Sequence, residues 1–341
     1  MNITKFFNKT NLEDTFILGY YGAGNFGDEL LLEIILGILK NKKYKNIKFF
    51  YSSPKKYKKT HQNYKFKLIN GSKKKEVLYN IFKSKNIIIG GGGLWGKDFS
   101  KNLLFLTIIL LFAKILRKNI YCIGVGYYDT APFLGKISAL IIANASKELI
   151  VRDPESFLNF KRFTKKVALD KDLAFFYELT NYEYKAEIEK VDNSTKKVII
   201  GLRRFKNRKI EKLWKKIIKE IVEKNKKTKF ILTIFEFKEM DQIGYKFIKD
   251  LERENKNVTA MEFNYNPLEM IYFLKKNAKN IKVICPQFHL SIASIITGTK
   301  FFPISYENKS KKLFEEYNIK YFEIDKITSK QVTKFLMEEK V

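Results

Sequence analysis

The residues best suited to bind an anion lie near the start of this 341-residue chain, in segment 19–29, which has the sequence GYYGAGNFGDE. The segment follows an apolar stretch of strand length and runs directly into an apolar helical pattern. Its glycines allow positive φ angles and close approach of a ligand, and the N–H groups that open a helix can meet an anion. We expect Gly24 and Asn25 to bind substrate. Asp28 and Glu29 can cap the helix or face a substrate hydroxyl, and these two uses are compatible.

A second glycine cluster follows the apolar segment 86–89. Four consecutive glycines are costly in conformational entropy, so a plain loop is a poor explanation for them. Two explanations stay open: a tight crossing from strand to helix, or a backbone cradle for phosphate or sugar. The cradle residues would be Gly90, Gly91, Gly92 and Gly93.

Neither cluster predicts a nicotinamide cofactor. Segment 22–27, GAGNFG, has the spacing of the dinucleotide fingerprint, which is weak evidence alone. The second predicted strand ends in SSPK at 52–55, which supplies no acidic ligand for a ribose.

Histidine occurs only twice in the chain. His61 lies in a lysine-rich polar stretch, which predicts a solvated loop residue. His289 follows the predicted strand 283–285 and opens an apolar helix, so we expect it at the carboxyl edge of a sheet. Its position supports a structural and a catalytic role about equally.

Cationic side chains also follow predicted strands. Arg203 and Arg204 come directly after strand 198–202, and Lys309 follows a strand that ends at Ser305-Tyr306. The planar guanidinium suits carboxylate and phosphate recognition. Arg152-Asp153 ends another strand, where either an ion pair that orders the wall of the site or a ligand contact fits.

The formal charge of +30 does not predict nucleic-acid binding. Only 7 of the 66 basic residues are Arg, the residue that pairs with guanine, and the abundance of Lys is typical of an AT-rich genome. A basic surface does favour anionic partners, such as phosphorylated substrates, lipid-linked phosphosugars or a negatively charged membrane face.

The two cysteines, Cys122 and Cys285, lie in apolar segments of a chain with no signal peptide at its start, which predicts buried, reduced thiols in a cytoplasmic protein. The apolar run 103–113 is shorter than the roughly 20 residues that span a bilayer. It suits a helix buried against a sheet, and its basic flanks leave interfacial membrane attachment as an alternative.

Apolar runs of strand length alternate with helical patterns along the chain, which predicts doubly wound parallel sheets. We expect an N-terminal Rossmann-like domain over 1–180, a polar linker over 181–197 and a C-terminal Rossmann-like domain over 198–341, facing each other across a cleft. The expected strands are 16–20, 47–51, 86–90, 120–125, 149–152, 198–202, 230–234, 258–261, 283–285 and 301–303; the expected helices are 28–39, 101–116, 133–145, 154–160, 210–224, 245–254, 268–276, 290–297 and 310–317.

Taken together, these pieces resemble the polysaccharide pyruvyl transferase family over nearly the whole chain. Their order and spacing carry the resemblance more than any single piece does. The matching pieces are GYYG at 19–22, GNFGDE at 24–29, GGGG at 90–93, VRDPES at 151–156, GLR at 201–203, FH at 288–289 and SYENK at 305–309.

The resemblance implies two domains similar to the GT-B glycosyltransferase fold, with the acceptor on the N-terminal side and the donor on the C-terminal side. It also implies transfer of the enolpyruvyl group of phosphoenolpyruvate to a sugar, which forms a pyruvate ketal without a metal or other cofactor. His289 would be the acid that protonates the donor methylene carbon, and Arg203 would hold the donor's anionic groups. From its position, we infer that Asp28 orients or deprotonates the acceptor hydroxyl.

The chain departs from the family pattern at one position. The family usually has Arg two residues before the histidine, where this chain has Gln287. Glutamine can still bind substrate, but loss of a charge-assisted hydrogen bond costs about 1.5–3 kcal/mol. Lys309, Arg204 or another lysine would compensate, or the donor differs.

The expected function is therefore a cytoplasmic pyruvyl transferase of cell-surface polysaccharide or exopolysaccharide synthesis, with an acceptor presented on a lipid carrier and peripheral contact with an anionic membrane. The alternatives are a GT-B glycosyltransferase that uses a nucleotide sugar, or a non-catalytic relative that binds anionic glycans.

Overall fold

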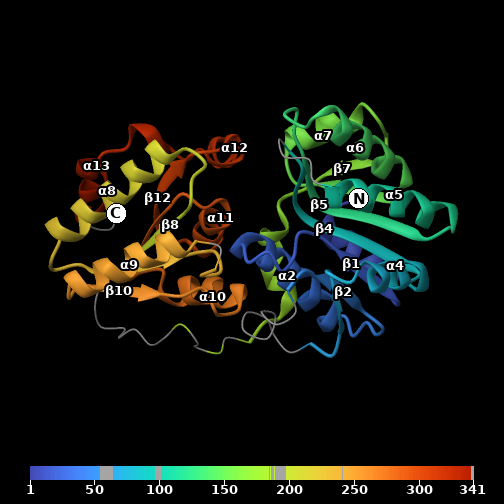
Figure 1. Ribbon diagram of the computed structural model, residues 1–341, viewed down its shortest axis with the longest axis horizontal. Helices are drawn as coiled ribbons and strands as arrows, with labels where there is room; N and C mark the ends of the chain where they lie inside the picture. Colours follow the sequence, from blue (N-terminus) through green and yellow to red (C-terminus); the bar gives the residue numbers. More distant parts are fainter. Residues whose placement is uncertain are drawn as a thin grey trace. The chain divides into compact units, whose positions relative to one another are not determined.

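Two parallel β-sheets, each flanked by helices, organise the chain (Figure 1). The computed structural model describes residues 1–53, 64–96, 101–183, 185, 188, 197–239 and 241–338, without the side chains of residues 101 and 102. His61 lies outside the described residues, as does most of the expected linker. The doubly wound α/β class predicted from the sequence is confirmed in both sheets.

The first sheet has strand order β3-β2-β1-β4-β5-β6-β7, and all its strands are parallel. Strands β2 and β3 lie on one side of β1, and strands β4 to β7 lie on its other side. The topological switch point, where such folds bind ligands, therefore lies between β1 and β4. The strands are β1 (Thr15–Leu18), β2 (Lys48–Tyr51), β3 (Lys67–Asn70), β4 (Asn86–Trp95), β5 (Asn119–Tyr127), β6 (Glu148–Val151) and β7 (Val167–Leu169).

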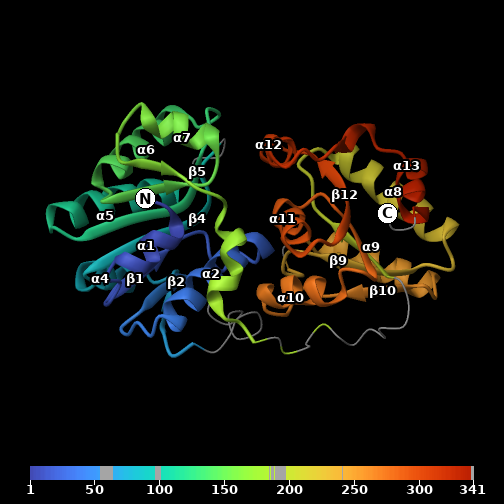
Figure 2. The ribbon, with the colours of Figure 1, turned by 180° about the vertical axis from the view of Figure 1, so that it is seen from behind.

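Helices cover both faces of this sheet because its strands are buried and apolar on both sides. One face packs against α4 (Lys74–Lys83), α5 (Lys101–Ile115), α6 (Phe133–Ala145) and α7 (Pro154–Lys161). Figure 2 shows the other face, with α1 (Ile3–Lys9) and α2 (Phe26–Asn41). Phe6 of α1 packs edge-on against Tyr121, with ring centroids 5.2 Å apart. The 3-10 helix η1 (Leu173–Thr180) lies beside α2, where Thr180 approaches Gly37.

The second sheet has strand order β10-β9-β8-β11-β12-β13, again parallel, with its switch point between β8 and β11. Its strands are β8 (Lys197–Leu202), β9 (Lys229–Ile234), β10 (Val258–Met261), β11 (Ile281–Cys285), β12 (Lys300–Ser305) and β13 (Phe322–Glu323). One face forms a core with α8 (Arg208–Lys224), α9 (Gln242–Glu254), η2 (Ile324–Lys326) and α13 (Ser329–Met337); the remaining helices are α10 (Pro267–Asn277), α11 (Phe288–Thr297) and α12 (Asn308–Glu316).

The chain divides into two units, and the division is not continuous in sequence. The first unit comprises Met1–Ala23 and Asp28–Glu183, and the second comprises Gly24–Gly27 and Tyr184–Val341. From the sequence, we expected Gly24–Gly27 to belong to the N-terminal domain. In the structure this segment belongs to the second unit, because its backbone pairs with residues that follow β9: Phe26 N–H donates to Phe235 O (3.0 Å), and Phe237 N–H donates to Gly24 O (2.9 Å).

The second glycine cluster also differs from expectation. We expected the strand to end at Gly90, but β4 continues to Trp95 and pairs with β5 through the glycines, with a register shift before Trp95. Gly91 and Gly92 have φ angles of 63° and 87°, which L side chains rarely adopt. The cluster is therefore an irregular strand end and not a crossing loop.

Several lysine-rich or short elements were not predicted from the sequence, because their segments lack a long apolar pattern. They are α1, β3, α4, β7, η1, β13, η2 and α13. Among the described residues, no helix is long and apolar enough to cross a membrane.

Both cysteines are free and buried, as the sequence predicted. Burial raises the pKa of Cys122 to about 12, against a smaller opposing effect of the hydrogen bond with Ser146, and burial also raises the pKa of Cys285. The reactive thiolate is therefore scarce at pH 8. We predict that a thiol reagent labels neither cysteine in the native protein at pH 8 and labels both after unfolding. Rapid labelling of the native protein, counted by mass spectrometry, would contradict this burial.

Candidate functional site

The candidate site in the second unit is built around the ends of β8 and β11, at the switch point of the sheet. Gln287 follows β11, and its side-chain amide donates to the carbonyl oxygen of Leu202, the last residue of β8 (2.6 Å). Its Oε1 contacts Cys285 Sγ, and the residue is buried. Gln287 therefore joins the two strand ends, and its hydrogen-bonding groups are engaged within the protein.

Arg203 and Lys309 share one carboxylate at the same sheet edge. Arg203 donates from Nη2 to Glu307 Oε1 (3.0 Å), and Lys309 Nζ lies 2.8 Å from Glu307 Oε2. The Arg203 guanidinium also lies over the ring of Tyr306, 4.2 Å from its centroid. All three charged side chains are partly exposed, at 22–32%. Two cations with one carboxylate leave this cluster, Arg203–Glu307–Lys309, with a net positive charge.

His289 is the second residue of α11, and its neighbour Phe288 contacts both its ring and Lys309 of this cluster. Lys309 Nζ lies 5.4 Å from the ring centroid of Phe288, and the Phe288 and His289 rings are 5.1 Å apart, edge to face. A Cβ atom at Gly27 would lie 1.9 Å from His289 Nδ1. The imidazole therefore lies directly against the backbone of the glycine-rich segment, where only glycine leaves room.

Asn25 and Glu236 complete the site in the second unit. The two residues form an antiparallel β-bridge, and Asn25 Oδ1 accepts from Gly27 N–H (2.9 Å), which caps α2. Burial raises the pKa of the Glu236 carboxyl, and Asp241 adds to the rise, while Arg203 and Arg204 oppose it. Arg204 is exposed at the sheet edge.

At the switch point of the first sheet, the glycine-rich loop packs against β4. Tyr21 donates its hydroxyl proton to Gly90 O, and Gly22 N–H donates to Glu29 Oε1 (2.9 Å). Burial raises the pKa of Tyr21, and the neighbouring carboxylates Asp28 and Glu29 raise it further. Glu29 is fully buried and holds the loop in place. Its expected contact with substrate stays a prediction.

Asp28 lies beside the glycine run of β4. A Cβ atom at Gly92 would lie 3.1 Å from an Asp28 carboxylate oxygen, and one at Gly91 would meet Leu31 at 2.6 Å. Gly93 is exposed at the end of the run, with Tyr128 and Arg152 beneath it. Because glycine has no side chain, the Asp28 carboxylate lies close to the backbone of β4.

Arg152 forms a buried network, but Asp153 is not its main partner. Arg152 donates to Asp172 Oδ2 (3.0 Å) and to the Tyr128 hydroxyl (2.7 Å), while the Asp153 carboxylate lies 3.8 Å away. Asp153 instead caps α7 by accepting from Ser156 N–H. Burial raises the pKa of Tyr128 to about 12. Of the two interpretations that the sequence left open, the structure favours an ordering ion pair, with Asp172 as the partner.

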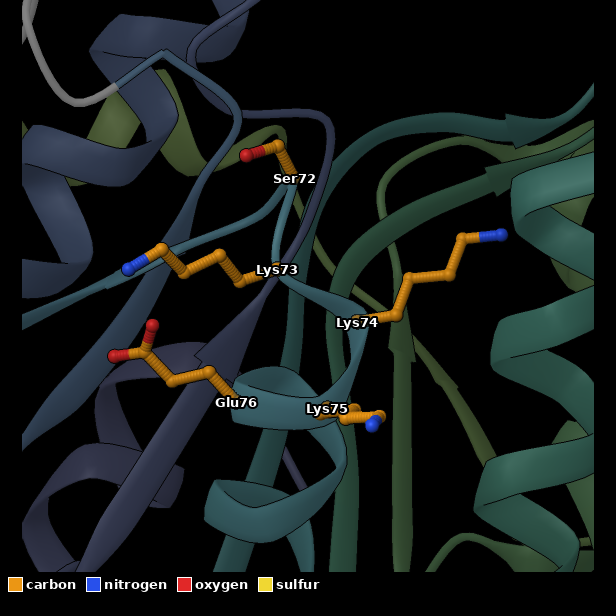
Figure 3. A pocket seen from close by; sticks show the side chains of 5 residues that line it. All are labelled: Ser72, Lys73, Lys74, Lys75 and Glu76. Atoms are coloured by element: carbon orange, nitrogen blue, oxygen red, sulfur yellow. The ribbon is translucent and has the colours of Figure 1, made fainter.

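A surface hollow of about 550 Å³ lies elsewhere in the first unit, at the start of α4 (Figure 3). Three adjacent lysines line it, together with Ser72 and Glu76. None of the candidate site residues lines it, so the hollow is not the site described above. The described residues also contain no group of three or more His, Cys, Asp or Glu side chains that could hold a metal ion.

With this geometry established, comparison with known proteins assigns the family. The family model for polysaccharide pyruvyl transferase matches residues 25–308. The chain belongs to the polysaccharide pyruvyl transferase family. The match includes Arg203, Gln287 and His289 and begins at Asn25, within the segment that pairs with the second unit. Comparison with curated proteins gives no match.

Solved structures of other proteins share the fold of this family member. The S. aureus MnaA–UDP structure matches with a TM-score of 0.63 at 10% identity, covering 95% of this chain and 88% of that chain. A UDP-GlcNAc 2-epimerase from Methanocaldococcus jannaschii matches at 0.62 and 14% identity, covering 94% and 91%. The Neisseria meningitidis enzyme bound to UDP-GlcNAc matches at 0.61 and 12% identity, covering 94% and 90%. These matches establish the GT-B-like architecture.

The predicted site residues divide between the two units of the chain. Gly24, Asn25, Arg203, Arg204, Gln287, His289 and Lys309 lie in the second unit; Asp28, Glu29, Gly91, Gly92 and Gly93 lie in the first. No role was predicted for Glu307, Tyr306 or Glu236, although SYENK at 305–309 follows a predicted strand and could have indicated the first two.

We predict that Arg152→Met destabilises the protein by about 3–5 kcal/mol, because it leaves the buried Asp172 carboxylate without its cation. The matched control is Arg162→Met, which removes an exposed ion pair with Asp129 (3.7 Å, both side chains more than 60% exposed). It should change the free energy of unfolding by less than about 1 kcal/mol. Urea denaturation of both variants measures the difference, and equal losses would contradict a buried network.

We also predict that Gly27→Ala displaces the His289 ring, because the new methyl group would overlap Nδ1. The NMR signals of His289 can be assigned because His61→Gln removes the only other histidine. The control is Gly298→Ala, at the C-terminal end of α11, the helix that carries His289. At Gly298, φ is 65° and nothing lies within 4 Å of a Cβ atom. The control should cost about 1–2 kcal/mol and leave the His289 signals in place. Unchanged signals in Gly27→Ala would contradict the contact.

Proposed function

We propose that this protein is a ketal-forming pyruvyl transferase, which moves the enolpyruvyl group of phosphoenolpyruvate to a sugar of a cell-surface polysaccharide or a lipid-linked glycan precursor. The observation that carries the proposal is the positive cluster Arg203–Glu307–Lys309, which Phe288 connects to His289. Phosphoenolpyruvate carries a carboxylate and a phosphate, so two adjacent cations fit its two anionic groups. Family membership supports a transferase, and the named chemistry is our inference from the site.

The donor would bind by replacing part of the contact between the cations and Glu307. Arg203 presents a planar pair of donors that suits a carboxylate, and Lys309 presents a mobile point charge that suits a phosphate. Both side chains are partly exposed, so a ligand can reach them from solvent. Gln287 is already bonded to Leu202 and Cys285. In this family, an Arg usually supplies a positive charge at position 287. We therefore assign that role in this chain to Lys309.

His289 would supply the proton that starts the reaction. Protonation of the donor methylene carbon forms a methyl group and leaves an oxocarbenium-like centre at the neighbouring carbon. One sugar hydroxyl adds there, a second hydroxyl closes the ketal, and inorganic phosphate leaves with the bonding electrons of its C–O bond. Of the two hydroxyl protons, one restores the acid that protonated the carbon, and the other protonates the departing phosphate. Asp28 would orient or deprotonate an acceptor hydroxyl, beside the backbone of Gly92.

We predict that acceptor-dependent release of phosphate from phosphoenolpyruvate falls about 10²–10⁴-fold in kcat in His289→Gln, as expected for loss of a general acid. Arg203→Met should lower kcat/KM by roughly 10- to 100-fold, which corresponds to one lost charge-assisted hydrogen bond. Asp28→Asn should affect the acceptor KM and kcat and leave donor affinity unchanged.

The controls are His61→Gln and Arg208→Met, the latter on an exposed residue in the first turn of α8. Both should retain full activity, and thermal melts should show that each variant is folded. Acceptors would be simple glycosides and lipid-linked glycans. A wild type that releases no phosphate but transfers sugar from a nucleotide sugar would support a GT-B glycosyltransferase instead. Donor binding without turnover on any acceptor would support a non-catalytic relative.

A further inference from the structure

The outer faces of α5 and α6 are apolar and exposed. On α5 the exposed large side chains recur at helical spacing, so they form one stripe opposite the face that packs on the sheet. On α6 the exposed residues likewise form one side of the helix. The stripe on α5 consists of Leu104, Ile108, Leu111, Phe112 and Ile115, continued by Leu116; that on α6 consists of Phe133, Leu134, Ile137 and Leu140.

Helices α5 and α6 lie side by side (Figures 1 and 2), and we call the surface formed by their two exposed stripes the α5–α6 face. A hydrogen bond of 2.6 Å between Thr107 Oγ1 and Ser138 Oγ joins the two helices. The ten side chains are 37–75% exposed. At about 200 Å² for a large exposed side chain, they present on the order of 1,000 Å² of apolar surface. The largest apolar patch of a typical monomer is roughly 300–600 Å², and larger patches mark interaction sites.

The charge around the α5–α6 face is positive. Segment 101–147 contains Asp129 as its one acidic residue. Basic residues lie on the two helices or at their ends: Lys114, Arg117, Lys118, Lys136 and Lys147. Four of these five are exposed, Lys118 being half-buried. Lys74, from the lysine-lined hollow in Figure 3, extends the positive rim to α5, where its Nζ lies 5.3 Å from the Phe105 ring centroid.

We propose that the α5–α6 face docks on an anionic lipid bilayer. An apolar stripe with interspersed lysines is the pattern of a helix that lies in the membrane interface, with its apolar side chains below the head groups and its cations at the phosphates. A second copy of this chain fits less well, because a twofold contact would place two positive rims opposite each other without acidic partners. The docking does not depend on the proposed pyruvyl transfer.

The buried side of α6 is connected to the end of β4. Ser138 Oγ accepts from Trp95 Nε1 (3.0 Å), and Trp95 is the last residue of β4, two positions beyond Gly93. Docking would therefore hold the end of β4 near the lipid head groups. If the proposed function holds, this position would suit an acceptor carried on a lipid, and that consequence alone rests on the proposed function.

The test is co-flotation of the full chain with vesicles of phosphatidylcholine containing 30% phosphatidylglycerol, and with phosphatidylcholine alone. The wild type should float with the anionic vesicles and much less with the neutral ones. The double variant Phe112→Ser/Phe133→Ser removes one large apolar side chain from each helix and should lower binding at least about tenfold. The matched control is Leu158→Ser/Ile243→Ser, which removes side chains that are 61% and 75% exposed on other helices and should leave binding unchanged.

A variant that removes positive charges from the face and a measurement of the protein's molar mass complete the experiment. Lys114→Gln/Lys136→Gln should weaken binding to anionic vesicles more than Lys216→Gln/Lys219→Gln on α8 does. Thermal melts should show that all variants fold. Failure of the wild type to float would overturn the proposal, and so would equal binding by all variants, which would indicate attraction by net charge alone. A wild-type dimer in light scattering that Phe112→Ser/Phe133→Ser makes monomeric, without vesicle binding, would identify a second copy as the occupant.

Discussion

The arrangement of the site depends on the pairing of Gly24–Gly27 with the backbone that follows β9. Two backbone hydrogen bonds hold this segment in the second unit, and Phe26 adds an edge-to-face contact with Phe235. The pairing brings the first turn of α2 against His289, at a separation that allows no Cβ at position 27. The helix then continues into the first unit, where its third residue is Asp28.

The electrostatics of the second unit follow from the same sheet edge. Parallel strands bring their carboxyl ends together, so residues that follow β8 meet residues that follow β11 and β12, which come more than 80 residues later in the sequence. Arg203 and Lys309 share the Glu307 carboxylate, and burial raises the pKa of the Glu236 carboxyl nearby. The site thus keeps a net positive charge that an anionic donor can neutralise. Gln287 contributes no charge, and its contacts hold the strand ends that carry these cations.

The sequence was sufficient for the fold class and for the neighbourhood of Arg203, His289 and Lys309, because long apolar runs mark strands and the strand ends fix which residues meet. It was insufficient where contacts between distant segments decide the outcome. Pairing of Gly24–Gly27 with the second unit depends on backbone groups that any sequence carries. The continuation of β4 through four glycines depends on its neighbour β5, since glycine alone predicts a loop. Lysine-rich α4 was missed because its pattern has little apolar content.

The proposed function requires that the second unit binds an anionic three-carbon donor between Arg203 and Lys309. Calorimetric titration of phosphoenolpyruvate into the full chain tests it most directly, with Arg203→Met, Lys309→Met and the exposed control Arg208→Met measured in the same buffer. The account predicts saturable binding to the wild type and the control, and at least a tenfold loss of affinity in each site variant, as expected for one charge-assisted contact. Equal affinity in all four proteins, or binding of a nucleotide sugar but not of phosphoenolpyruvate, would contradict it.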